Sequence, residues 1–401
     1  MSALRVLGGR DLHGDRLDLV VVDGLVHGPN NHRPNNHGPN NHGPNDRGPT
    51  LDAAGLVVAP GLLDLQVNGA AGADVTAEPE RLAEVGAELV RHGVTAYLPT
   101  VITAAPEARA RAFAALHAER AAAGAGRAVP LGLHLEGPMI APERAGAHPS
   151  RWLREPSLDL VDGWSRAAGV VMATVAPELP GALEVIAELC RRGVVVSVGH
   201  TAASAAQVDA AVAAGAACAT HLFNAMPPMT AREPGPVGAV LGGTGPDGTG
   251  LVAGLIVDGL HLDPHTVRTA WQVLGADRFW SVSDTTAALG LGDGPTRLGD
   301  QDVLVADGAV RLADGTLAGS AVSLAHCVRT LWSTTGCTLA EAVATATSTP
   351  ARLVGDTSRG TLAPGARGDL VLLDVDVATH RLDVVATVVG GSVVHDRRRE
   401  G

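Results

Sequence analysis

Three residues of this chain carry the side chains of a divalent-metal site: Glu136, His200 and His221. Imidazole nitrogen and carboxylate oxygen are the ligands that a borderline cation such as Zn²⁺ takes, and three protein ligands leave one position open for water. Each of the three follows a short apolar run, where a predicted strand ends. We therefore predict a mononuclear site with one divalent metal per subunit, for which Zn²⁺ is favoured and Fe, Co or Mn are alternatives.

Two further residues have the chemistry of a hydrolytic site. Asp284 ends another apolar run, in SVSDTTAALG, and a carboxylate beside a metal can take a proton from water and return it to a leaving group. The alternative for Asp284 is a turn aspartate bonded to neighbouring hydroxyls. His148 lies in a Gly-rich loop after Glu136 and is suited to donate a hydrogen bond to an oxyanion.

The loop that follows His221, THLFNAMPPMTAREPG, carries amide and guanidinium groups. Such groups bind an anion such as phosphate, so Asn224 and Arg232 are candidate anion contacts. His261, in DGLHLD, is a further candidate donor. A plain surface position remains the alternative for Arg232.

Eight apolar runs between residues 60 and 350 alternate with Ala-rich helical patterns. This alternation predicts an α/β fold, a (β/α)8 TIM barrel, whose strands carry catalytic groups at their C-terminal ends. A doubly wound sheet is disfavoured because no GxGxxG turn follows the first strand. His134 lies two residues before Glu136 and therefore shares a strand face with it. It could be a fourth metal ligand, but we favour a supporting residue beside the ligands. The predicted strands are 62–68, 95–102, 130–136, 170–176, 194–200, 217–221, 251–257 and 279–284, and predicted helices include 78–92, 105–123, 180–192, 203–214 and 263–275.

The two ends of the chain differ from the middle. Both consist of short alternating stretches broken by Gly and Asp, typical of a small β-sheet. We predict one small β-sandwich subdomain made of residues 1–58 and 360–401, with the hydrolase barrel at 59–359. Within it, residues 27–49 form a five-residue HGPNN-type repeat, whose prolines exclude a helix. Its histidines could chelate a metal, but we favour a low-complexity loop insertion.

Composition excludes several classes of protein. The net charge of −12 argues against nucleic-acid binding, and no uncharged apolar run is long enough to span a membrane. The N-terminus lacks the pattern of a signal peptide, and the four scattered cysteines suggest buried small hydrophobes; we expect a cytoplasmic protein. The sequence contains no Lys, which excludes Schiff-base chemistry, P-loops and a carboxylated-lysine metal bridge.

Seven runs together resemble the N-acetylglucosamine-6-phosphate deacetylases of the amidohydrolase superfamily. The resemblance covers about residues 55–370 in the family's order and spacing. It implies hydrolysis of the acetamide of N-acetylglucosamine 6-phosphate, in amino-sugar catabolism and cell-wall recycling, by a homodimer. The runs are PGLLDLQVNGAAG, LHLEGPMIAPERAGAH, VGHTAAS, ATHLFNAMPPMTAREPG, VDGLHLD, VSDTTAALG and LAGSA.

The resemblance also implies a role for individual residues. It places Asp284 as the catalytic acid/base and His148 as the group that polarises the acetyl carbonyl. The implied metal ligands are Glu136, His200 and His221. The implied sugar-phosphate contacts are Asn224, the Ala225 backbone, Arg232 and His261, and Gly319 and Ser320 resemble the loop beside the acetyl pocket.

One departure bears on the number of metals. Many superfamily members begin the first strand with HxH, which binds a second metal, whereas this chain has Gln66 and Asn68 there. Amides are poor Zn²⁺ ligands compared with imidazole, so these are expected to be vestigial second-metal positions. Two alternatives stay open: another amidohydrolase reaction on the same barrel, by a deaminase or cyclic amidase, and a non-catalytic metal-buffering protein that uses the His27–His42 repeat.

Overall fold

The computed structural model describes residues 3–29, 48–122, 126–243 and 250–400. Its centre is a parallel sheet whose strands follow chain order around a ring, and a parallel bridge between Val67 and Thr285 joins its two ends. The predicted (β/α)8 barrel is confirmed. The barrel strands are β6 (Leu62–Val67), β9 (Val94–Ile102), β11 (Leu133–Glu136), β12 (Val170–Val175), β13 (Val195–Val198), β14 (Cys218–Ala219), β15 (Val252–Ile256) and β16 (Phe279–Val282), and β10 (Val129–Pro130) pairs with β9.

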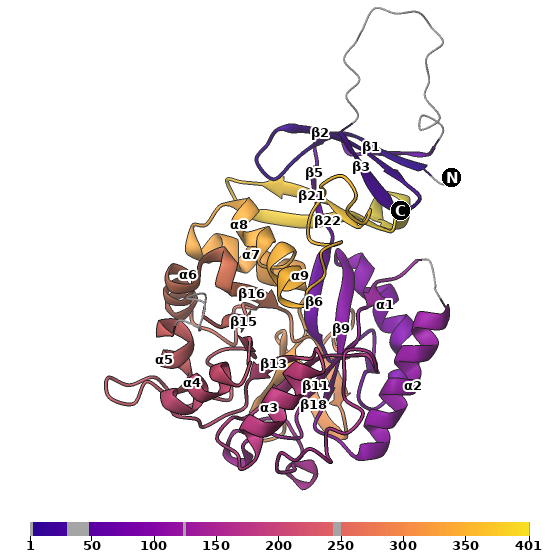
Figure 1. The fold of residues 1–401 in the computed structure, drawn as a ribbon. Helices are drawn as coiled ribbons and strands as arrows, with labels where there is room; N and C mark the ends of the chain where they lie inside the picture. Colours follow the sequence, from indigo (N-terminus) through magenta and orange to yellow (C-terminus); the bar gives the residue numbers. More distant parts are fainter. Residues whose placement is uncertain (1–2, 30–47, 123–125, 244–249, 401) are drawn as a thin grey trace, which may run out of the picture.

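Helices cover the outside of the barrel (Figure 1). α1 shows why they form: its apolar residues recur at helical spacing, so Leu82, Val85 and Leu89 are buried on one face. α4 begins with a capping box between Ser204 and Gln207. The helices are α1 (Leu82–Arg91), α2 (Pro106–Ala122), α3 (Ala182–Arg191), α4 (Ala205–Ala213), α5 (Gly235–Gly242), α6 (Pro264–Arg278), α7 (Leu324–Thr335), α8 (Leu339–Ala344) and α9 (Ser348–Leu353).

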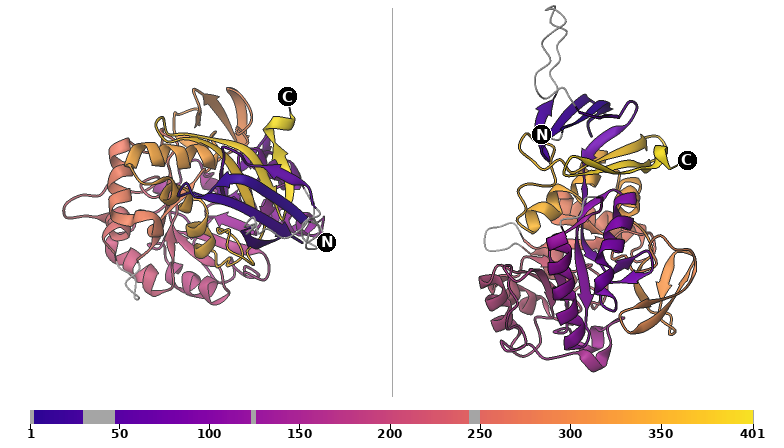
Figure 2. Two further views of the ribbon diagram at one scale, coloured as in Figure 1. Left: turned by 90° about the horizontal axis from the view of Figure 1, so that it is seen from above. Right: turned by 90° about the vertical axis from the view of Figure 1, so that its right-hand side faces the viewer.

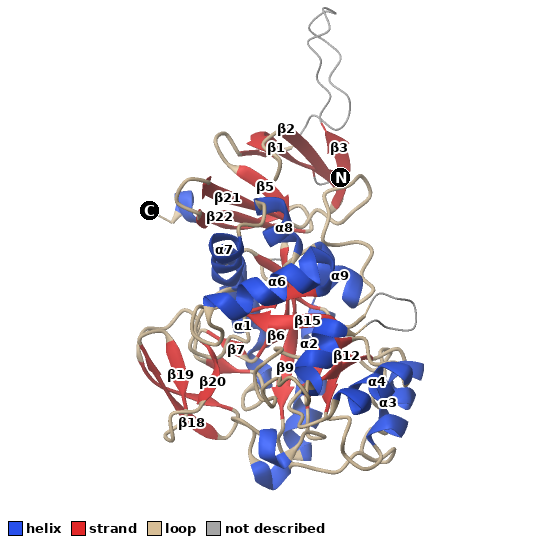
Figure 3. Ribbon diagram, turned by 90° about the vertical axis from the view of Figure 1, so that its left-hand side faces the viewer, coloured by secondary structure: helices blue, strands red, loops and turns tan. Residues whose placement is uncertain are grey.

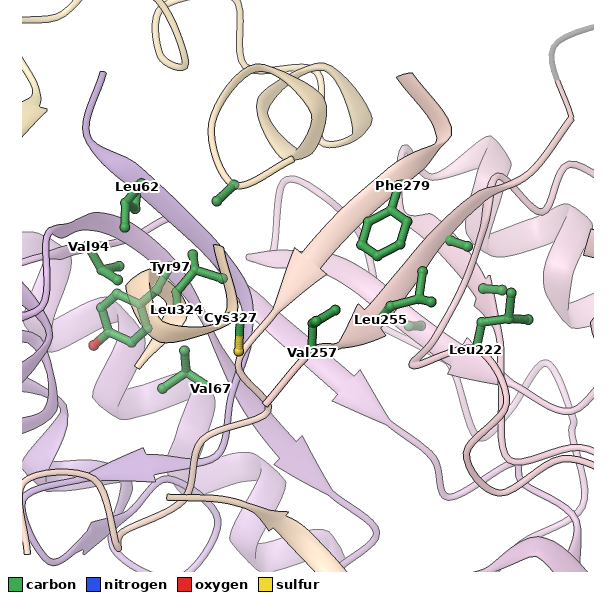
Figure 4. Close-up of a cluster of buried hydrophobic side chains, with 14 of the residues drawn as sticks. Leu62, Val67, Val94, Tyr97, Leu222, Leu255, Val257, Phe279, Leu324 and Cys327 are labelled. Carbon is green, nitrogen blue, oxygen red and sulfur yellow. The ribbon is translucent and has the colours of Figure 1, made fainter. Parts of the chain in front are cut away.

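The strands bury two separate sets of side chains because successive residues point to opposite sides of a sheet. Leu255 belongs to a large cluster that includes helix residues such as Leu324, and it lies between sheet and helices (Figure 4). Its neighbour Ile256 packs instead with Trp280 and other strand residues. This second set therefore faces the barrel axis and fills it.

Both ends of the chain build one further sheet, because β5 and β21 pair antiparallel. It lies at one end of the barrel (Figure 2), where β5 leads directly into β6. The exact extent of the subdomain stays a prediction, and most of the repeat lies outside the described residues. The strands are β1 (Ala3–Arg10), β2 (Arg16–Val22), β3 (Leu25–Pro29), β4 (Thr50–Asp52), β5 (Val57–Pro60), β21 (Leu370–Asp376), β22 (Arg381–Val389) and β23 (Ser392–Asp396).

A four-stranded antiparallel sheet at the other end of the barrel was not predicted (Figure 3). It follows β16 and is fastened to two barrel loops: the Gly299 N–H donates to Asp74 at 2.9 Å, and the Gln301 amide donates to the Ala147 carbonyl at 2.7 Å. No helix of the described chain is long and apolar enough to cross a membrane. The added strands are β17 (Gly294–Leu298), β18 (Gln301–Ala306), β19 (Ala309–Arg311) and β20 (Leu317–Ser320), and β7 (Gly69–Ala70) and β8 (Ala73–Asp74) form a hairpin.

The packing of the barrel interior leaves no room for a side chain at Gly254. A Cβ atom there would lie 2.8 Å from the Trp280 indole ring, so we expect Gly254→Ala to lower the free energy of unfolding by about 1–3 kcal/mol through overpacking. Chemical denaturation measures this change. Gly242→Ala is the control, because its Cβ would meet nothing within 4 Å; equal stability of the two variants would contradict the interior packing described here.

Candidate active site

A cavity of about 330 Å³ opens at the C-terminal ends of the barrel strands. Loops after β11, β13, β14, β15 and β16 meet there, and the four-stranded sheet adds Leu298 and Thr316 to the wall. The structure thus brings together most of the residues that the sequence singled out. Those that line the cavity are Asn68, Glu136, His148, His200, His221, Asn224, Ala225, His261, Asp284 and Gly319.

Glu136, His200 and His221 point their donor atoms at one another. Glu136 Oε1 lies 3.2 Å from His200 Nε2 and 3.0 Å from His221 Nε2, and the two nitrogens are 3.1 Å apart. A tetrahedral metal with bonds of about 2.0–2.1 Å separates its ligand atoms by about 3.3–3.4 Å. The three groups therefore fit one divalent cation, and the spacing is close to one face of such a tetrahedron.

Neighbouring groups fix these side chains. His200 Nδ1 lies 2.8 Å from the Arg144 carbonyl, which accepts its proton and leaves Nε2 free to bind a cation. His200 and His221 both have positive φ, +48° and +25°, which turns the side chains at the strand ends. Burial raises the pKa of Glu136, but its interactions with the adjacent His200 and His221 outweigh burial and hold the pKa well below its usual value.

His148 lies against the same cluster but presents a proton rather than a lone pair. The backbone N–H of Thr103 donates to His148 Nδ1 at 3.2 Å, so the ring proton of the neutral imidazole is on Nε2. That Nε2 faces Glu136 Oε2 at 3.9 Å. Burial, followed by the neighbouring His200, lowers the pKa of His148 to about 3. The ring is therefore a neutral hydrogen-bond donor at the edge of the cavity.

Asp284 lines the same cavity, and its backbone has a φ of +50°. The Asn68 amide donates to its Oδ1 at 2.8 Å, and its carbonyl accepts the Ser320 N–H at 2.9 Å. Burial, with the nearby Glu136 charge, raises the pKa of Asp284 to about 6. Ser320 itself is buried behind Asp284 and supports its position rather than lining the cavity.

Two predicted supporting residues are buried beneath the cavity. The Gln66 amide donates to Glu136 Oε1 at 3.1 Å, so its NH₂ group faces the cluster. His134 Nε2 lies 2.8 Å from the Thr174 hydroxyl, and burial lowers the pKa of His134 to about 4. Neither side chain is among the cavity-lining residues.

The structure brings some of the predicted anion contacts to the cavity and leaves one outside it. Asn224, Ala225 and His261 line the cavity, and His261 Nδ1 is held by Asp258 Oδ2 at 2.7 Å. Arg232, by contrast, is exposed and is not among the residues lining this cavity. The structure does not bring Arg232 to the other candidates within one chain.

Sequence reasoning missed several residues of the site. Thr103 orients His148, and Leu298 and Thr316 come from a sheet that the pattern did not reveal. Arg144 lies in the run ERAGAH, which the sequence analysis used only for His148. The positive charge of Arg144, in a Gly-rich loop that follows Glu136, was the one sequence feature that could have identified it as a site residue.

Comparisons with known proteins identify the family of this chain. The family model described as "Amidohydrolase family" matches residues 57–394. N-acetylglucosamine-6-phosphate deacetylase of Homo sapiens is 38% identical over 354 residues, covering 86% of this chain and 84% of that protein. The enzyme of that name from Bacillus subtilis is 33% identical and covers 84% of each chain.

Solved structures agree as well. N-acetylglucosamine-6-phosphate deacetylase from Pasteurella multocida superimposes with a TM-score of 0.85 at 28% identity, over 98% of this chain and 99% of that one. A mutant of the enzyme from Mycobacterium smegmatis, in complex with N-acetyl-D-glucosamine-6-phosphate, gives 0.81 at 33% identity, over 98% and 99%.

The barrel, its Glu–His–His cluster and the family match define the class: the chain belongs to the amidohydrolase family. Within that family, its similarity over most of its length places it among the N-acetylglucosamine-6-phosphate deacetylases. The family membership that the resemblance implied is thereby confirmed.

A buried acid below the site predicts how stability depends on pH. Asp64 has no exposed surface and accepts hydrogen bonds from the Ser283 hydroxyl and the Gln66 N–H. Burial raises its pKa from 3.8 to about 7. Between these values the folded chain holds a proton that the unfolded chain has lost, so the contribution of Asp64 to stability is full at low pH and is lost as the pH rises through about 7.

We therefore expect the Tm of the parent protein to fall more steeply between about pH 4 and pH 7 than that of Asp64→Asn, because Asn mimics the protonated acid at every pH. Thermal unfolding across this range measures the difference. Asp209→Asn on exposed α4 is the matched control. Parallel curves for the parent and Asp64→Asn would refute the assignment.

Proposed function

We propose that this chain hydrolyses the acetamide of N-acetyl-D-glucosamine 6-phosphate to D-glucosamine 6-phosphate and acetate. The observation that carries the proposal is the convergence of Glu136, His200 and His221 beside Asp284 in one cavity. The substrate rests on membership of the deacetylase group, one of whose members is described in complex with this sugar phosphate.

Glu136, His200 and His221 would hold one divalent metal, for which Zn²⁺ is our choice because imidazole and carboxylate suit it. When bound, such a metal polarises a carbonyl and makes water more acidic. His221 Nδ1 is buried without a hydrogen-bond partner, so its orientation depends on what Nε2 binds. Gln66 donates to the ligand oxygen of Glu136, which leaves its amide nitrogen, a non-ligand, facing the cluster; this favours a single metal.

The chain's own residues supply the proton transfers. Asp284 accepts a proton from the attacking water and delivers it to the departing amine; the Asn68 amide keeps its carboxylate aimed at the cavity. His148 donates a hydrogen bond from its Nε2–H to the acetyl oxygen as negative charge develops there, and it keeps its proton. Asn224, the Ala225 backbone and His261 position the sugar phosphate, and Gly319 leaves room beside Asp284 for the acetyl group.

The proposal includes the cellular location and the oligomeric state of the enzyme. We infer a cytoplasmic homodimer, with Arg232 completing the phosphate site near the contact between subunits. Its exposed position in a single chain is compatible with that arrangement. A deaminase or cyclic amidase is the rival, and Gln66 in place of a metal-binding histidine on the first strand disfavours both.

The decisive measurement is acetate release from N-acetylglucosamine 6-phosphate and from the unphosphorylated sugar, before and after chelation. We expect release from the phosphorylated sugar that chelation abolishes and added Zn²⁺ restores. Equal turnover of both sugars would keep the deacetylase and discard the phosphate contacts. No release from metal-loaded protein would overturn the proposal in favour of a rival amidohydrolase reaction.

Asp284→Asn tests the proton transfer. An amide cannot accept the water proton, so we expect kcat to fall by about 10²- to 10⁴-fold while metal content, measured by atomic absorption, stays the same. Asp302→Asn, at an exposed acid on the added sheet, is the control and should keep full activity. Turnover of Asp284→Asn at the parent rate would sink the assignment.

A further inference from the structure

A second cavity, of about 280 Å³, lies between the outer helices α1 and α7 and strand β22 of the sheet that the chain ends build. None of its described lining residues belongs to the active-site cavity. Its wall is basic, in a chain whose net charge is −12. A concave surface with an excess of cations attracts anions. The charged and titratable lining residues are Arg91, His92, His326, Arg329, Asp383 and Arg397.

Arg329 is the cation of the second cavity that lacks an anionic partner. Arg91 lies 3.1 Å from a Glu400 carboxylate oxygen, which partly neutralises it. Arg397 likewise faces Asp374 at 3.6 Å. Arg329 is half-buried and forms no ion pair with a carboxylate of the described chain. A guanidinium in this position is suited to a phosphate group, which accepts two of its hydrogen bonds side by side.

His326 connects Arg329 to the interior of the barrel. The Ser323 hydroxyl accepts the His326 backbone N–H at 3.2 Å, which fixes the first turn of α7. A guanidinium can only donate, so Arg329 donates to His326 Nδ1 at 3.3 Å and the ring proton is on Nε2. That Nε2 donates to the Asp258 carbonyl at 3.2 Å. Burial lowers the pKa of His326, in agreement with a neutral ring.

Asp258 in turn holds His261, which lines the active-site cavity. Its Oδ2 lies 2.7 Å from His261 Nδ1, and its Oδ1 accepts the backbone N–H groups of Leu260 and His261, both at 2.8 Å. A continuous series of hydrogen bonds therefore runs from the second cavity to the active site. Hydrogen bonds in such a series polarise one another, so a change at one end alters the strength of the others.

We propose that the second cavity binds a phosphate-bearing anion, held chiefly by Arg329, and that the bound anion weakens substrate binding through His326 and Asp258. The anion draws the guanidinium away from His326 Nδ1, which makes the Nε2–H a weaker donor to the Asp258 carbonyl. Inorganic phosphate and a phosphorylated sugar present the same group, and the experiment separates them. The anion site does not depend on the proposed function; only its effect on turnover does.

Calorimetry on the metal-loaded full chain counts the phosphate sites. We expect the parent to bind two equivalents, one in each cavity, and Arg329→Gln to bind one of them about 10- to 100-fold more weakly, the weight of a charged hydrogen bond. Arg329→Lys should lie between, because it keeps the charge but loses the fork. Arg268→Gln is the matched control: it is half-buried, donates to the Thr334 carbonyl, lines neither cavity and should keep both sites.

Two titrations identify the source of the phosphate group. Inorganic phosphate that still binds one equivalent beside saturating glucosamine 6-phosphate identifies the free anion. Two equivalents of glucosamine 6-phosphate in the parent, and one in Arg329→Gln, identify a phosphorylated sugar. Equal numbers of sites in the parent and Arg329→Gln with both ligands would overturn the proposal. Exposed Arg397→Gln guards against a folding defect: it should weaken the second site alone, and unchanged binding there beside a lower Tm in Arg329→Gln would also overturn the proposal.

Kinetics test the connection to the active site. The inhibitor is inorganic phosphate or glucosamine 6-phosphate, whichever occupies the second cavity. We expect its binding there to raise KM for N-acetylglucosamine 6-phosphate by about 2- to 10-fold, the weight of one hydrogen bond, beyond competition at the active site. A plot of KM against inhibitor concentration is then curved in the parent and linear in Arg329→Gln, which shows competition alone.

Linear plots in both proteins would overturn the coupling between the two cavities. A parent protein that binds two equivalents but releases no acetate would overturn the proposed function and leave the anion site in place.

Discussion

Two imidazole nitrogens and a carboxylate oxygen, held within 3.2 Å of one another on buried residues, are the constraint on which the structure depends. Nothing in a chain brings such groups together spontaneously, because each loses hydration on burial. A bound divalent cation would offset that loss. The barrel brings the three groups together because β11, β13 and β14 end at the same mouth. Glu136 is the residue common to all these contacts, because its Oε1 lies against both histidines and Gln66.

The layer beneath the cluster explains how the strand ends stay in place. The Thr220 hydroxyl lies 2.7 Å from that of Thr174 and 2.6 Å from that of Ser197, which ties β12, β13 and β14 together below the ligands. Gly199 permits this approach, because a Cβ there would lie 2.7 Å from Thr220 Cβ. The backbone then adopts a positive φ at His200, and the His200 ring faces the cavity.

The barrel could be predicted because its strands are continuous apolar runs between helical patterns, and the ligands because polar residues end those runs. Residues 294–320 gave no such signal, because β17 and β18 alternate more buried with exposed positions. These strands gain a core by packing against Ile102 at the end of β9 and Ala147 and Ala288 of barrel loops. Arg144 and Arg232 look alike in sequence, since no local pattern records which guanidinium lines a cavity. That difference comes from how long loops pack, over distances that sequence spacing does not fix.

Strands and loops therefore carry different parts of the chemistry. The groups that we propose to hold a metal and move a proton sit at strand ends, where hydrogen bonds between strands limit their movement. The groups that we propose to contact the rest of the substrate, such as Asn224 and His261, sit on loops whose sequence can change without moving the strand-end cluster. Arg144 connects the strand-end cluster with the loops, because its carbonyl accepts a hydrogen bond from His200 while the residue lines the cavity. A change of substrate at this site thus requires new loop side chains but the same loop backbone.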